Sequence, residues 1–163
     1  MSYLVDTNFL LRLVQSTSSL QPYARNTYSS LQSQGEVLMI VPQNLYEFWV
    51  VATRPVNVNG LGLSTELASE VLTQAKQLFV LQPDVPEILT IWEQLVTTYR
   101  VMGKQAHDAR LVAAMVAHQI THLLTFNTAD FKRFAEITAI EPRSIATASS
   151  EFRDEKDFDP KLL

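Results

Sequence analysis

Residues 2–13 read SYLVDTNFLLRL and contain an acid that its neighbours do not explain. The apolar run 3–5 predicts a short buried strand, and the apolar residues within 9–14 predict a helix. Asp6 lies in the tight turn between these two segments, and Arg12 is the only base nearby. An ionised carboxylate enclosed there costs on the order of several kcal/mol unless a hydrogen bond or a positive charge meets it. Asp6 is therefore expected either to cap the following helix or to bind a cation.

The rest of the chain alternates short apolar segments with longer helical ones. The expected strands are 3–5, 37–41, 79–81, 122–125 and 138–140, and the expected helices are 9–14, 23–34, 45–53, 65–76, 85–99, 109–118 and 129–134. Ser64 is expected to cap one helix, and Asp84 with Glu87 resembles a capping box before another. Continuous apolar strands such as VLMIV at 37–41 are typical of parallel sheets covered on both faces. The pattern predicts a three-layer α/β/α fold with a central parallel sheet of four to five strands.

Composition limits the possible classes of function. The chain has 163 residues, of which 47% are hydrophobic and 18% charged, an ordinary globular composition. It contains no cysteine, which excludes thiolate metal sites and is compatible with a cytoplasmic location. No apolar run approaches the roughly 20 residues of a membrane span, so no membrane association is expected. Residues 1–145 are expected to form a single domain, with 146–163 as a peripheral or flexible tail.

Three further acids occupy unusual positions. Glu47 is the only charged residue in a segment that is apolar nearly all the way round. Asp108 falls in the first turn of a helix, and Leu111 and Val112 continue its face inward. Asp130 enters a short helix just after a strand has ended. These positions are not those of acids on an ordinary solvent-facing stripe.

Each of these acids also has a structural explanation. Glu47 could pair with Arg12 or Arg54, and Asp108 could complement the helix dipole, a contribution of about 0.3–1 kcal/mol. Asp130 could simply be a surface residue. Taken together, however, acids that follow strand ends gather at the carboxyl edge of a parallel sheet, where sites form. Oxygen ligands of this kind suit magnesium or manganese, and the absence of cysteine disfavours structural zinc.

The order of these motifs resembles a known family. The markers are LVDTNFLL at 4–11, the isolated Glu47, HDARLVA at 107–113 and LLTFNTADF at 123–131. The sequence resembles PIN domains over about residues 2–145, and especially the small VapC-type toxins. The resemblance implies that Asp6, Glu47 and Asp108 bind divalent metal, with either Asn127 or Asp130 as a further ligand. The sequence does not decide between these last two.

The resemblance also implies an activity and partners. A PIN-like protein is expected to hydrolyse RNA phosphodiester bonds with Mg²⁺ or Mn²⁺, with Asp6, Glu47, Asp108 and Asp130 as catalytic acids. VapC-type proteins pair with a small antitoxin and usually form homodimers. The alternatives are a protein-binding module with weak or lost nuclease activity, and a solitary ribonuclease without antitoxin. The sequence identifies neither the RNA target nor the number of metal ions.

Supporting residues follow from their position beside these acids. Hydroxyl and amide side chains that could orient carboxylates, or merely cap helices, are Thr7, Asn8 and Thr125. The net charge of −4 argues against a broad electrostatic grip on nucleic acid, so local bases must hold any RNA. The candidates are Arg12, Arg100, Lys104, Arg110, Lys132 and Arg133.

Overall fold

The structure, a computed structural model, describes residues 1–148 of the chain. The strands are β1 (Ser2–Val5), β2 (Val37–Ile40), β3 (Val80–Leu81), β4 (His122–Leu124) and β5 (Thr138–Ile140). The helices are α1 (Thr7–Val14), α2 (Gln21–Ser33), α3 (Pro42–Thr53), α4 (Thr65–Leu78), α5 (Glu87–Thr98), α6 (Gln105–Ala117), α7 (Thr128–Phe131) and α8 (Pro142–Ala148), and a short 3₁₀ turn, η1 (Val56–Val58), follows α3.

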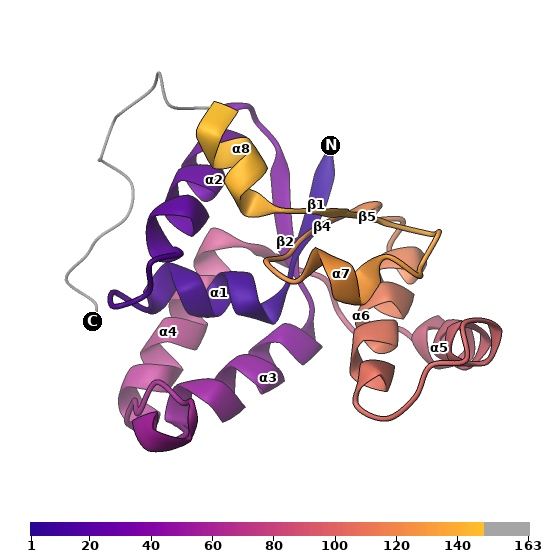
Figure 1. Ribbon diagram of the computed structural model, residues 1–163, viewed down its shortest axis with the longest axis horizontal. Helices are drawn as coiled ribbons and strands as arrows, with labels where there is room; N and C mark the ends of the chain where they lie inside the picture. Colours follow the sequence, from indigo (N-terminus) through magenta and orange to yellow (C-terminus); the bar gives the residue numbers. More distant parts are fainter. Residues whose placement is uncertain (149–163) are drawn as a thin grey trace.

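Within residues 1–148 the strands form one five-stranded sheet in the order β3-β2-β1-β4-β5. Every pairing is parallel, and β1 lies at the centre between β2 and β4. Helices cover both faces of this sheet (Figure 1). The predicted three-layer α/β/α fold is confirmed.

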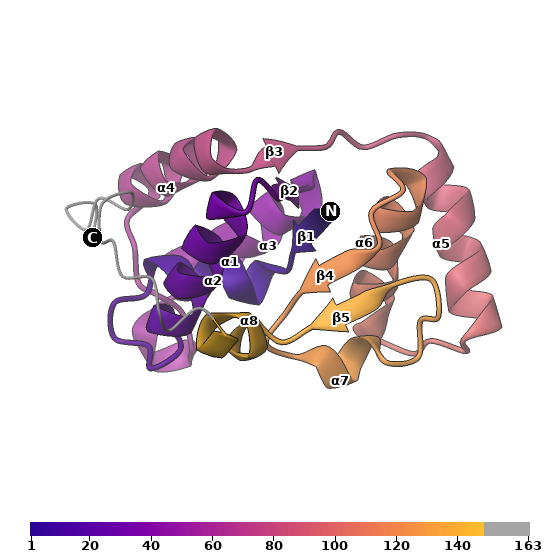
Figure 2. The same cartoon turned by 90° about the horizontal axis from the view of Figure 1, so that it is seen from above.

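Alternate residues of the strands enter different hydrophobic cores. In β1, Tyr3 and Val5 pack into the core formed with α1, α2, α3 and α4, whereas Leu4 packs into the core formed with α5 and α6. The pattern repeats in β4, where Leu124 joins the first core and Leu123 the second. This division follows from the period of two along a strand, which sends successive side chains to opposite faces. Figure 2 shows the consequence, with α4 at one end of the molecule and α5 and α6 at the other.

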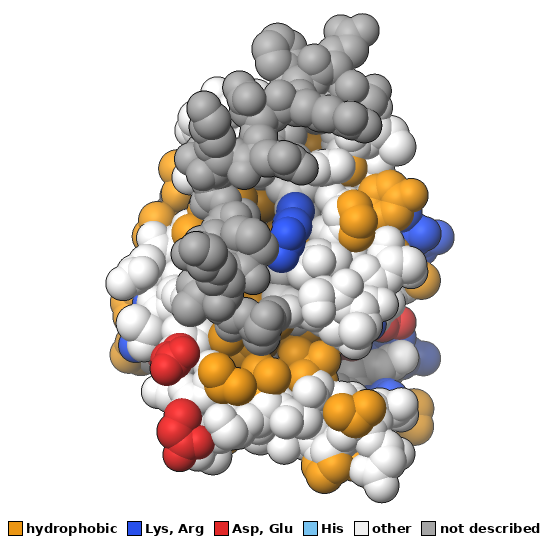
Figure 3. Space-filling model, turned by 90° about the vertical axis from the view of Figure 1, so that its left-hand side faces the viewer, with side chains coloured by type: hydrophobic (Ala, Val, Ile, Leu, Met, Phe, Trp, Pro, Cys, Tyr) orange, Lys and Arg blue, Asp and Glu red, His pale blue; other side chains and the backbone are white. Residues whose placement is uncertain are grey.

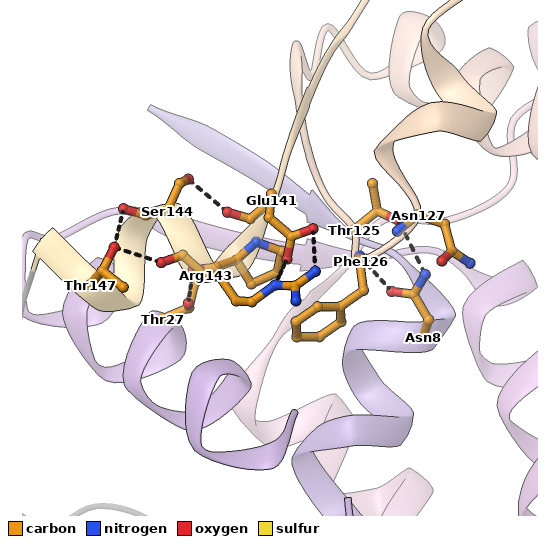
Figure 4. Close-up of polar contacts among 10 residues, drawn as sticks. Asn8, Thr27, Thr125, Phe126, Asn127, Glu141, Arg143, Ser144 and Thr147 are labelled. Carbon is orange, nitrogen blue, oxygen red and sulfur yellow. Dashed lines mark hydrogen bonds and ion pairs between the residues drawn. The ribbon is translucent and has the colours of Figure 1, made fainter. Parts of the chain in front are cut away.

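The helix α8 was not predicted from the sequence. It packs against α2, and the hydroxyl of Thr27 donates a hydrogen bond of 2.8 Å to the carbonyl oxygen of Pro142 at its start (Figure 4). The helix crosses residue 145, where the domain was expected to end. The remainder of the expected tail, 149–163, lies outside the described residues.

One predicted helix start is confirmed and one is wrong. The hydroxyl of Ser64 accepts a hydrogen bond from the backbone N–H of Leu67 and caps α4, as expected. Asp84 makes no cap for α5. Its carboxylate pairs instead with the guanidinium of Arg110, at 3.1 Å.

The outer surface of the described residues carries separate apolar patches. On the face seen from the left of Figure 1, hydrophobic side chains gather in patches separated by polar surface (Figure 3). None of the helices within 1–148 combines the length and apolarity that a bilayer span requires.

Candidate active site

Asp6 is positioned by the pairing of the two central strands. Val5 of β1 lies opposite Leu124 of β4, and the N–H of Asp6 donates a hydrogen bond of 2.9 Å to the carbonyl of Leu124. The parallel register therefore brings Asp6 next to Thr125, the residue that follows β4. The buried hydroxyl of Thr125 donates a hydrogen bond of 2.7 Å to Oδ2 of Asp6. Only 9% of Asp6 is exposed.

Asp6 also caps the following helix, which confirms one of its two predicted roles. Its Oδ1 accepts a hydrogen bond of 2.7 Å from the backbone N–H of Thr7, and the extended backbone of Asp6 is typical of a cap. The side-chain amide of Asn8 donates to Oδ2 at 3.0 Å. Because its oxygens accept these hydrogen bonds, the Asp6 carboxylate is held in a fixed orientation.

Asn8 joins α1 to the loop that follows β4. Its Nδ2 also donates to the hydroxyl of Thr125, at 3.1 Å, while its Oδ1 accepts a hydrogen bond of 3.2 Å from the N–H of Phe126. Figure 4 shows Asn8 directed from α1 toward this loop. The predicted placement of Asn8 and Thr125 beside Asp6 is present in the structure.

A buried asparagine attaches α3 to the end of β1. Asn44 is fully buried, its Oδ1 accepts from the N–H of Val41 at 2.8 Å, and its Nδ2 donates to the carbonyl of Val5 at 3.0 Å. The first turn of α3 is thereby fixed against the residue that precedes Asp6. Glu47, one turn later on α3, faces the start of α1 as a result.

Hydrogen bonds hold both carboxylate oxygens of Glu47. The hydroxyl of Thr7 donates to Oε2 and the amide of Gln43 donates to Oε1, each at 2.8 Å. The predicted alternative, an ion pair with Arg12 or Arg54, is wrong, because in residues 1–148 no ion pair joins Glu47 to either base. Neutral donors orient Glu47 without cancelling its charge.

Asp108 and Asp130 lie in the first turns of their helices. The helix α6 begins at Gln105, four residues earlier than predicted, which places the half-buried Asp108 in the first turn. Among the described residues, its carboxylate has neither a hydrogen bond nor an ion pair. Asp130 is exposed on α7, and the backbone N–H of Asn127 donates to the hydroxyl of Thr125 at 3.0 Å.

The acids lie close enough to perturb one another. Burial raises the pKa of Asp6 from its ordinary value of 3.8 to about 6; the hydrogen bonds from Thr125 and Thr7 oppose this, and the charges of Glu47 and Asp108 add to it. Burial likewise raises the pKa of Asp108 to about 6, assisted by the charges of Asp130 and Glu47. These acids share a negative field, which the charges of His107 and Lys104 oppose at Asp108, and such a field favours the binding of a cation.

The donor set fits a hard divalent ion in its chemistry. Carboxylate oxygens are the ligands that magnesium and manganese prefer, and the raised pKa values of Asp6 and Asp108 reflect burial first, with the charges of the neighbouring acids adding to it. In residues 1–148, however, no three acidic or histidine side chains form a group that could hold an ion as they stand. The acids would have to approach one another when a cation neutralises their repulsion.

The predicted RNA-binding bases differ in their surroundings. Arg100, Lys104, Lys132 and Arg133 are exposed, and the charge of Lys104 opposes the raised pKa of Asp108, so this lysine lies close to the site. Arg100 has a left-handed backbone with φ of 50°, which fixes the turn between α5 and α6.

The other two bases are engaged within the protein. The guanidinium of Arg12 donates to the side chain of Gln15, and that of Arg110 donates to Gln43 in addition to pairing with Asp84. These contacts direct both guanidinium groups toward protein side chains, while Nε of Arg12 is buried without a hydrogen-bond partner among the described residues.

Gln43 and Asn44 are site residues that the sequence analysis missed. A glutamine four residues before Glu47 lies on the same face of a helix, so the i, i+4 spacing could have identified Gln43. Asn44 stands three residues after Val41, the residue that precedes α3, and this is the spacing of a side chain that folds back to the start of a helix.

A family model for the PIN domain matches residues 3–137. The chain belongs to the PIN domain family. Among curated proteins, no significant match is found.

Solved structures with a similar fold come from several organisms. One is a chain of VapBC2 from Rickettsia felis bound to a promoter DNA fragment, with 16% identity over 86% of this PIN domain chain and 98% of that chain, at a TM-score of 0.67. Another is a chain of a toxin-antitoxin complex from Klebsiella pneumoniae, with 20% identity over 86% and 97%, at 0.60. FitAcB from Neisseria gonorrhoeae gives 16% identity over 86% and 97%, at 0.62. At these identities the likeness establishes the fold.

Proposed function

We propose that this PIN domain is a divalent-metal-dependent ribonuclease that hydrolyses RNA phosphodiester bonds, and that it is the toxin of a toxin-antitoxin pair. The observation that carries the proposal is the set of acids at the carboxyl edge of the sheet. Asp6 precedes α1 and Asp108 lies in the first turn of α6, and the pKa of each is about 6. A raised pKa means that the folded protein destabilises the charged carboxylate, and a purely structural role does not explain this cost in stability.

Asp6, Glu47, Asp108 and Asp130 would hold the metal. Asp130 is preferred to Asn127 because its charge raises the pKa of Asp108. When bound, Mg²⁺ or Mn²⁺ supplies a water of lowered pKa and stabilises the charge that develops on the leaving oxygen. Hydrogen bonds from Thr125, Asn8 and the N–H of Thr7 fix the orientation of both Asp6 oxygens, which supports this role.

The RNA backbone would be bound beside α6 and α7. Arg100, Lys104, Lys132 and Arg133 are exposed there, and the side chain of Arg133 also donates to Gln105 at the start of α6. The protein is acidic overall, so these few bases would supply the phosphate contacts. An RNA substrate of this kind implies action in the cytoplasm.

Protein partners are the second part of the proposal. Similar folds occur in VapBC structures and in a toxin-antitoxin complex, and this chain would likewise bind a small antitoxin and form a homodimer. On the outer face of α3, Tyr46 and Val50 are one turn apart and 65% and 60% exposed. Exposed apolar side chains at adjacent turns are a feature of interfaces.

A cleavage assay tests the catalytic part. Labelled RNA is incubated with wild type and with Asp6→Asn, each with Mg²⁺, with Mn²⁺ and with EDTA. Wild type is expected to cleave only with metal and to leave 5′-phosphate and 3′-hydroxyl ends, and Asp6→Asn is expected to be inactive although Asn can still cap α1. Cleavage in EDTA, or equal cleavage by the variant, would contradict the proposal.

Light scattering tests the assembly. Wild type is expected to have the mass of a dimer, and Tyr46→Glu with Val50→Glu is expected to dissociate it. Glu93→Lys, a charge change on the exposed surface of α5, is the control. A monomeric wild type would contradict the dimer while leaving the cleavage result intact.

A further inference from the structure

We propose that Gln43 is a positioning residue that holds Glu47 of α3 in a fixed relation to the first turn of α6, where Asp108 lies. The inference deepens the proposed function and rests on it, because it concerns how the acids of that site are aligned. It assigns no direct contact between Gln43 and substrate.

Gln43 is a buried polar side chain whose hydrogen-bonding groups are almost fully used. It is 6% exposed. Its Nε2 donates to Oε1 of Glu47 and to the backbone carbonyl of His107, both at 2.8 Å. Its Oε1 accepts from the guanidinium of Arg110 at 3.1 Å. One amide thus contacts Glu47 on α3 and His107, the residue immediately before Asp108.

The chemistry of these neighbours fixes which way the amide points. The two groups that face its nitrogen, a carboxylate and a carbonyl, can only accept hydrogen bonds. The group that faces its oxygen, a guanidinium, can only donate. A flipped amide would oppose like groups on both sides, so the orientation of Gln43 is determined by the site itself.

An ion pair anchors the far end of this arrangement. Arg110 donates to Gln43 from α6 and pairs with Asp84, which precedes α5. Asp84, Arg110, Gln43 and Glu47 therefore form one continuous chain of polar contacts. Arg110, proposed from the sequence as an RNA contact, is in this view the support of Gln43.

These polar contacts matter because α3 and α6 pack in different hydrophobic cores. Phe48 of α3 packs in the core with α1 and α4, whereas Leu111 of α6 packs in the core with α5 on the other face of the sheet. Apolar packing therefore sets each helix against the sheet, and the polar contacts of Gln43 set the helices against each other. Removing the polar contacts of Gln43 should therefore let the distance between Glu47 and Asp108 vary without unfolding either core.

The decisive variant is Gln43→Met, which keeps the volume and length of the side chain but removes the amide. The matched control is Gln21→Met. Gln21, on α2, is also buried, and it also donates a hydrogen bond to a backbone carbonyl, that of Leu13, at 3.0 Å. A second variant, Arg110→Met, leaves Gln43 in place and removes only its support. Circular dichroism and melting curves establish that each variant is folded.

Three measurements are made on each protein. Backbone hydrogen exchange without metal reports on the first turn of α6, calorimetry with Mn²⁺ reports the metal affinity, and RNA cleavage gives kcat and KM. For Gln43→Met we expect faster exchange at residues 107–109, Mn²⁺ affinity lower by about tenfold or more, and a reduced kcat at unchanged KM. Arg110→Met should give a smaller change in the same direction, and Gln21→Met should change none of these quantities.

The outcomes separate the two proposals. Unchanged exchange at 107–109 overturns the role of Gln43 whatever the metal does. Faster exchange with unchanged Mn²⁺ affinity and kcat also overturns it, because the contact would then be structural only. If wild type neither binds Mn²⁺ nor cleaves RNA, the proposed function fails, and exchange alone decides whether Gln43 links the helices.

Discussion

Replacing Asp108 by asparagine should make the metal-free protein more stable. The pKa of Asp108 is about 6, against an ordinary value of 3.8. At about 1.4 kcal/mol for each pKa unit, this corresponds to about 3 kcal/mol against the charged form at neutral pH. Because the side chain is only half-buried, solvent screening reduces the figure to about 1–1.5 kcal/mol. Losing the charge at the helix N-terminus offsets about 0.3–1 kcal/mol.

The net expectation for Asp108→Asn is a gain of about 0.5 kcal/mol, or a Tm higher by about 1–2 °C for a chain of this size. The sign depends on pH in a defined way. Stability from protonated Asp108 is fully present below pH 4, near the ordinary pKa, and is lost as the pH rises through about 6. The advantage of the variant should therefore be largest above pH 7 and shrink between pH 6 and pH 4.

Thermal melts in EDTA from pH 4 to pH 8 measure this difference. Glu93→Gln removes a charge from the exposed surface of α5 and serves as the control, with no pH-dependent gain expected. Mn²⁺ should stabilise wild type more than Asp108→Asn. A variant less stable than wild type at pH 7.5, or a difference that does not change with pH, would refute the account of Asp108 as a destabilised ligand.

Further predictions concern RNA binding, the site and one loop. The slope of log K against log salt for RNA binding, measured by fluorescence titration, should be about −2, and a slope steeper than about −5 would contradict this. The double variant Lys132→Ala with Arg133→Ala should flatten the slope for all RNA sequences alike. Thr125→Val should raise the pKa of Asp6 further and lower stability at pH 7.5 by about 1.5–3 kcal/mol, less at pH 4, as melts at both values would test. Gly60→Ala should destabilise the protein in urea melts without changing metal affinity, since its Cβ would lie 1.8 Å from the backbone carbonyl oxygen of Arg54.

The sequence was sufficient to predict the parts of the fold that depend on local pattern. The apolar run before Asp6 gave the central strand, and the alternation of short apolar and helical segments gave the parallel sheet. The sequence also placed Asp6 and Thr125 at strand ends, whereas the pairing of β1 with β4, which brings the two side chains together, became visible only in the fold.

Contacts between distant segments could not be predicted in the same way. Asp84 has the spacing of a capping residue, yet its carboxylate is drawn to Arg110, which is 26 positions away along the chain. Gln43 likewise depends on α6, more than 60 residues later. A local pattern cannot reveal that a side chain is satisfied by a partner on another helix, because the alternative partner appears only when the fold is complete.

Because α3 and α6 pack in separate cores, we infer that their relative position can change without disturbing either core. A misplacement of about 1 Å in a reacting group can cost about a hundredfold in rate. A protein that wedges against the outer side of either helix could shift Glu47 relative to Asp108 by such an amount while leaving every acid, and both cores, chemically intact. Inhibition of this kind needs no access to the acids and no mimicry of RNA, and it is reversed as soon as the wedge is removed.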